Sequence, residues 1–71
     1  MTEKPHNPIS YAPFWNTLKA SSETTYTLVN KHGISSATMN RLKHDMPVTT
    51  MTICALCQIL NCRVEDIFEC K

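Results

Sequence analysis

Residues 24–44, TTYTLVNKHGISSATMNRLKH, decide the fold, because they predict two short helices joined at a glycine. Gly33 is the only glycine in the chain. A residue without a Cβ readily adopts the left-handed conformation that ends a helix and redirects the backbone. Beyond it, Met39 and Leu42 are three residues apart and therefore share one helical face. This pattern is typical of a helix-turn-helix.

The second helix of this unit, residues 35–44, presents small, polar and basic side chains opposite its apolar face. When Met39 and Leu42 point inward, Ala37, Arg41 and His44 point outward. Helices of this kind can enter the DNA major groove, where asparagine and arginine side chains hydrogen-bond to base edges. The alternative interpretation is a polar helix face that is merely solvated.

The length and composition of the chain indicate one small folded domain. With 71 residues there is room for a modest core, and a hydrophobic content of 42% argues against a disordered chain. Pro5 and Pro8 disfavour regular structure near the start of the chain. We therefore expect a flexible tail over residues 1–8 and a folded DNA-binding domain over residues 9–71.

The charge of the chain is nearly balanced but unevenly distributed. The formal net charge is +1, which is low for a DNA-binding domain. Residues 24–44 nevertheless contain three basic side chains, two histidines and no acid, whereas three of the six acids lie within residues 65–69. One basic surface on a nearly neutral chain is therefore expected, with binding to DNA that is sensitive to salt.

The flanking sequence predicts three further helices. Pro13 suits the first turn of a helix whose Phe14, Trp15 and Leu18 face the core, and Thr24 suits the cap of the helix that follows. After a turn at Pro47, four apolar residues recur at helical spacing, namely Ile53, Leu56, Cys57 and Leu60. Asn61 is suited to a left-handed end of that helix, and a last short helix would carry Val64, Ile67 and Phe68.

Three segments in this order resemble one family. They are ISYAPFWNTLKA (residues 9–20), YTLVNKHGISSATMNRLKHD (residues 26–45) and TICALCQILNCRVEDIF (residues 52–68). Together they resemble small bacterial Cro/repressor-type regulators of the XRE-like family. The resemblance implies an all-α, compact five-helix, lambda-repressor-like domain of bacterial or phage origin that acts in transcription regulation.

The resemblance also implies which residues face DNA, namely Thr25, Ser35, Ser36, Ala37, Thr38, Asn40, Arg41 and Lys43. Phosphate contacts are expected from Thr25 and Ser35, base contacts from Ser36, Asn40 and Arg41, and a backbone contact from Lys43. The family usually has glutamine in place of Thr25 and alanine in place of Val29. Thr25 is too short to brace a base, and Val29 is expected to widen the crossing of the two helices slightly.

The four cysteines suggest a metal site as a separate hypothesis. Cys54, Cys57, Cys62 and Cys70 include one Cys-x-x-Cys pair, which could contribute to a zinc site. Cys54 and Cys57 would, however, lie in the middle of a helix rather than in tight turns. Cysteine is also common as a small buried apolar residue. We therefore expect no metal and no cofactor.

No pattern of catalytic residues is evident, and the chain is expected not to be an enzyme. His32 and His44 have no carboxylate or nucleophile at a spacing that indicates catalysis, and a single glycine excludes a glycine-rich phosphate loop. No segment has the approximately 18 apolar residues that span a membrane. A cytoplasmic location is expected, with reduced thiols.

The function expected from these observations is sequence-specific binding of double-stranded DNA by a transcriptional regulator, most simply a repressor, that places residues 35–44 in the major groove. The alternative is a protein-interaction module of the same fold, such as an accessory or antirepressor-like protein. The expected partners are double-stranded DNA and a second copy of the chain, with no small-molecule ligand. An interface between copies would involve residues 9–11 and the exposed ends of the last two helices.

Overall fold

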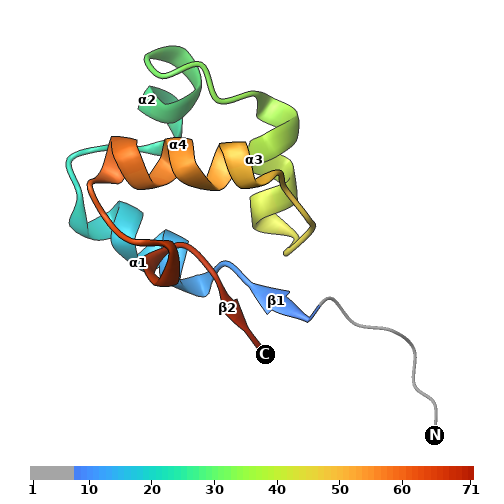
Figure 1. Cartoon of the computed structure of the whole chain (residues 1–71). Helices are drawn as coiled ribbons and strands as arrows, with labels where there is room; N and C mark the ends of the chain where they lie inside the picture. The colour runs from blue at the N-terminus through green and yellow to red at the C-terminus, as the bar shows by residue number, and fades with distance from the viewer. Residues whose placement is uncertain (1–7) are drawn as a thin grey trace, which may run out of the picture.

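The computed structural model describes residues 8–71 (Figure 1). Within them lie four α-helices, one 3-10 turn and two short strands. In chain order these are β1 (Ile9–Ser10), α1 (Ala12–Ala20), α2 (Thr25–Asn30), α3 (Ser36–Lys43), α4 (Thr50–Leu60), η1 (Val64–Asp66) and β2 (Glu69–Cys70). The flexible tail expected for residues 1–8 lies outside the described residues except at Pro8.

Three helices begin at a hydroxyl side chain that accepts a backbone N–H bond. Thr24 caps α2, Ser35 caps α3 and Thr49 caps α4, in each case by accepting from the N–H three residues further on. The first N–H groups of a helix have no partner within the helix, so these bonds stabilise the helix start. The cap predicted at Thr24 and the left-handed residue predicted at Asn61, with φ of 53°, are both confirmed.

Helix α1 begins differently, because Tyr11 at its cap position accepts no bond through its side chain. The Ser10 hydroxyl accepts from Ala12 N–H (3.2 Å), and the chain after α4 supplies further acceptors. Phe14 N–H donates to the carbonyl of Ile67 (3.1 Å), and the Thr17 hydroxyl donates to the carbonyl of Asp66 (3.0 Å). The fifth helix expected here is thus a single 3-10 turn, η1, whose end is held by its contacts with α1.

A two-stranded antiparallel ribbon joins the two ends of the described chain. Ile9 pairs with Cys70 and Ser10 with Glu69, and Lys71 N–H donates to the carbonyl of Pro8 (2.7 Å). The all-α expectation contained no strand. Two residues per strand are too few to show the alternation of side chains by which a strand is found in a sequence.

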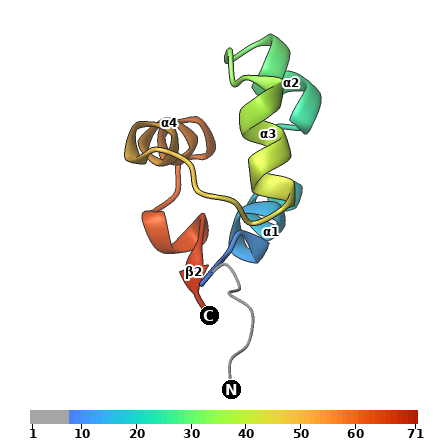
Figure 2. The same cartoon turned by 90° about the vertical axis from the view of Figure 1, so that its right-hand side faces the viewer.

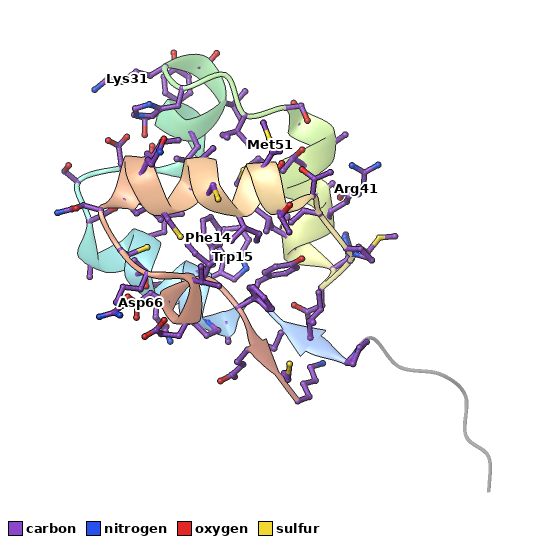
Figure 3. All side chains as sticks on the ribbon, in the orientation of Figure 1. Phe14, Trp15, Lys31, Arg41, Met51 and Asp66 are labelled. Atoms are coloured by element: carbon purple, nitrogen blue, oxygen red, sulfur yellow. The ribbon has the colours of Figure 1, made fainter. Side chains whose placement is uncertain are left out.

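The core draws one or more side chains from every helix. Its fully buried members are Tyr11, Phe14, Leu28, Leu42, Leu56 and Ile67. Figure 3 shows Phe14 and Trp15 between α1 and α4. Their ring centroids are 4.7 Å apart, and the rings meet edge to face. Trp15 is half-buried and packs against the core, as predicted.

A membrane span needs both length and apolar character, and none of the helices of residues 8–71 meets both requirements.

Candidate nucleic-acid interface

The turn between α2 and α3 depends on the glycine that the sequence singles out. Gly33 has φ of +76°, which is the left-handed conformation predicted for it. Its neighbour Ile34 donates its N–H to the carbonyl of Leu28 (2.9 Å), so the chain folds back against the end of α2. Helix α3 then starts at a new angle beside α2, as Figure 2 shows.

Helix α3 divides into a buried side and an outward side. Met39 and Leu42 are 5% and 0% exposed, which confirms them as the inward pair. Ser36, Ala37, Asn40, Arg41 and Lys43 are all exposed. In Figure 3 the Arg41 side chain points away from the body of the molecule. The arrangement leaves a polar and basic helix face that other molecules can reach.

Two of the eight candidate residues already have partners within the helix. The Ser35 hydroxyl accepts from Thr38 N–H (3.0 Å) and donates its proton to Thr38 Oγ1 (2.9 Å). Thr38 is half-buried, whereas Ser35 is exposed. Ser35 therefore acts first as the cap that holds the start of α3, a role that its spacing from Thr38 could have suggested from the sequence.

A groove of about 430 Å³ with mixed polar and apolar lining lies between α2 and α3. Within residues 8–71, no acidic side chain lines it. Four of the candidate residues line it, and the lining is Thr25, Tyr26, Val29, Asn30, Ser36, Met39, Asn40 and Lys43. Sequence analysis did not single out Tyr26, whose side chain is 72% exposed. The groove thus brings the start of α2 next to the outward side of α3.

An acid next to the turn is paired, which sequence reasoning did not anticipate. Glu23 Oε1 accepts from the Thr27 hydroxyl (2.7 Å) and lies 3.3 Å from Nε2 of His32. The Thr27 hydroxyl bond, followed by His32, lowers the pKa of Glu23. The pair is nine residues apart in sequence, a separation that neither a helix nor a strand periodicity brings together.

The thiols are free, and they do not converge on one point. Cys54 and Cys70 are exposed, whereas Cys57 and Cys62 are half-buried. Burial raises the pKa of Cys62 to about 11, so its thiol is protonated near neutral pH. Among residues 8–71, no group of three or more His, Cys, Asp or Glu side chains is arranged to hold a metal ion.

A second hollow, of about 310 Å³, lies between the ribbon and α4. It is uncharged and almost entirely apolar. Its lining is Ile9, Tyr11, Pro47, Val48, Thr50, Ile53, Cys54, Val64 and Phe68. Val64 at its edge is 48% exposed. This lining overlaps the expected interface between copies at Ile9 and Tyr11, at the start of α4 and at Val64.

These features define a helix-turn-helix domain: two short helices joined at a left-handed glycine, with the second presenting a basic, acid-free face. The family model of the Cro/C1-type HTH DNA-binding domain matches residues 14–71. The chain belongs to this family. A search of curated proteins gave no match.

A solved structure supports the same conclusion. The crystal structure of the transcriptional regulator VanUg, form II, is 25% identical in sequence and superposes with a TM-score of 0.82. The similarity covers 100% of this chain and 96% of that one. The chain is therefore similar to a transcriptional regulator in fold, in agreement with the family resemblance.

Proposed function

We propose that this protein is a repressor that binds specific double-stranded DNA sequences by placing α3 in the major groove. The single observation that carries the proposal is the outward face of α3, where Ser36, Asn40 and Arg41 are exposed together. Asparagine pairs with adenine and arginine with guanine through two hydrogen bonds each, and such pairs discriminate between bases. Family membership supports the DNA-binding part of the proposal.

The remaining candidate residues would position the protein rather than specify sequence. Thr25 at the first turn of α2 and Ser35 at the cap of α3 suit phosphate contacts, and Lys43 supplies a positive charge at the other end of α3. Ala37 and Thr38 are small, so α3 can lie close to the base edges. Residues 9–71 would act as one DNA-binding domain.

We also infer that the DNA-bound protein is a homodimer. Regulators with this motif commonly bind two half-sites about one helical turn apart, and two copies related by a two-fold axis match such a site. The apolar hollow beside the ribbon offers an uncharged surface for a second copy.

The homodimer is tested by the substitution Val64→Glu, which would place a charge at the edge of this hollow. Sedimentation equilibrium should then show that the variant is a monomer where the wild type is a dimer. The circular dichroism spectrum of the variant should remain that of a helical protein.

The proposed function is tested in two stages. Repeated selection from a random duplex library identifies any preferred sequence. An amide-resolved NMR titration with the selected duplex, at low and higher salt, then locates the contact. Shifts concentrated on Thr25 and residues 35–44 that weaken as salt rises are the expected result. If no sequence is enriched, or if the shifts fall on another surface, the alternative of a protein-interaction module of this fold would replace the proposal.

A further inference from the structure

Tyr26 is the feature of the α2–α3 groove that sequence analysis did not explain. It lies two residues before Leu28, which is fully buried, so the helical period turns Tyr26 almost directly away from the core. Its carbonyl accepts from Asn30 Nδ2 (3.0 Å), while its side chain is 72% exposed. A large aromatic side chain in this position contributes little to folding through burial.

The surroundings of Tyr26 suit a polyanion. Lys43 lies on the opposite wall of the groove, and none of the described residues that line the groove is acidic. Thr25 and Asn40 add neutral hydrogen-bonding groups to the lining of the groove. A phenol has an apolar ring that can pack against a sugar and a hydroxyl that can donate to a phosphate oxygen. The groove is also continuous with the face of α3 that would enter the major groove.

We propose that Tyr26 contacts the DNA sugar-phosphate backbone, with its ring against a deoxyribose and its hydroxyl donating to a phosphate oxygen in the groove between α2 and α3. This inference rests on the proposed function, because it assumes that α3 faces the duplex. It adds a residue that the family resemblance did not indicate. The contact is neutral, so it would contribute affinity without releasing an additional counterion.

The substitution Tyr26→Phe isolates the hydroxyl, and Tyr26→Ala also removes the ring. Fluorescence anisotropy would measure the binding of each variant to a labelled mixed-sequence duplex of about 20 base pairs and to the selected duplex. Loss of a hydrogen bond to a charged group should weaken binding by Tyr26→Phe about tenfold. The loss should be equal on both duplexes, and Tyr26→Ala should lose more. The slope of affinity against salt should remain that of the wild type.

Met51→Ala is the matched control, because Met51 is 80% exposed on α4 and does not line the groove. The affinity of the Met51→Ala variant for both duplexes should equal that of the wild type. Urea unfolding midpoints of all three variants should be close to that of the wild type, since exposed positions contribute little to stability. If a Tyr26 variant lost affinity only in proportion to a lowered unfolding midpoint, the inference would therefore be overturned.

Two further results would overturn it while leaving the proposed function intact. In the first, both Tyr26 variants bind DNA as tightly as the wild type, although Arg41→Ala and Lys43→Ala weaken binding. The other is a loss confined to the selected duplex, which would assign Tyr26 to base recognition instead. If the wild-type protein binds neither duplex, the proposed function itself fails, and the inference fails with it. The outcomes are thus distinguishable in one set of titrations.

Discussion

The backbone N–H of Tyr11 donates to Oδ1 of Asp45 over 3.0 Å, and this bond joins the start of α1 to the turn after α3. The Tyr11 hydroxyl donates to the carbonyl of Met46 (2.8 Å) and reinforces the same junction. Asp45 has φ of +55°, the left-handed conformation that ends α3. The proposed recognition helix is thereby fixed at both ends, by Gly33 before it and by Asp45 after it.

Removal of the Asp45 carboxylate should loosen this junction. Asp45→Ala deprives the Tyr11 N–H of its acceptor. It also places alanine in a left-handed conformation that aspartate tolerates better. We therefore expect the free energy of unfolding to fall by about 2 kcal/mol. Asp45→Asn keeps an acceptor oxygen and tolerates the conformation, so its loss should be smaller. Urea denaturation followed by circular dichroism measures both.

The ion pair of Asp45 with Lys71 serves as the control. These side chains are 3.8 Å apart and substantially exposed, so Lys71→Ala should change stability by less than about 0.5 kcal/mol. Equal losses from Lys71→Ala and Asp45→Ala would show that charge, rather than the bond to Tyr11, accounts for the effect.

Gly33→Ala should destabilise the protein through backbone conformation alone. In the described part of the chain, no heavy atom beyond the adjacent residues lies within 4 Å of the place that a Cβ would take, so a clash contributes nothing. A φ of +76° in an L-residue with a Cβ costs about 1–2 kcal/mol. Gly33→Asn should cost less, because asparagine tolerates this region. Thermal unfolding compares the two, and an unchanged midpoint for Gly33→Ala would mean that the turn adopts a different conformation in solution.

Glu23 should make stability depend on acidic pH. Its pKa is lowered from the ordinary value of 4.5, chiefly by the Thr27 hydroxyl and then by His32. A carboxyl whose folded pKa is depressed stabilises the fold above its unfolded pKa, and this contribution disappears as pH falls through the folded value. The wild type should therefore be more stable than Glu23→Gln at neutral pH, and the difference should shrink below about pH 4.5.

A second variant identifies the cause of that pH dependence. Thr27→Val removes the hydroxyl that donates to Glu23 but leaves the carboxylate and His32 in place. The stability of this variant should vary less with acidic pH than that of the wild type, although its absolute stability also falls because the cap of α2 is weakened. Urea unfolding at several pH values provides the comparison. An unchanged pH profile in Thr27→Val would assign the effect to His32.

Arg41 and Lys43 should differ in how their loss affects DNA binding. Arg41→Ala should lower affinity for the selected duplex by about 1–3 kcal/mol and relax its sequence preference, because a base contact is removed. Lys43→Ala should weaken all sequences alike and reduce the slope of affinity against salt by about one. Anisotropy titrations at several salt concentrations separate the two. Similar losses on every sequence from both variants would contradict this division of roles.

The sequence by itself determined the elements that depend on neighbours along the chain. The left-handed conformations of Gly33 and Asn61, the cap at Thr24 and the inward pair Met39 and Leu42 follow from local backbone preferences and from the helical period. Such signals span only a few residues, so they can be recognised without a structure. The same helical period placed Ser36, Ala37, Asn40 and Arg41 on the outward face of α3, where they are exposed, whereas the other four candidate residues rested on the family resemblance.

Tertiary structure alone decided the contacts between distant segments. The bond from Tyr11 to Asp45 spans 34 residues, the carbonyl of Ile67 after η1 accepts from Phe14 N–H in α1, and the ribbon pairs the two ends of the described chain. The groove that places Tyr26 opposite Lys43 likewise exists only once α2 and α3 have packed. These contacts carry no periodic signal in the sequence, because burial of the shared core, rather than local preference, brings the segments together.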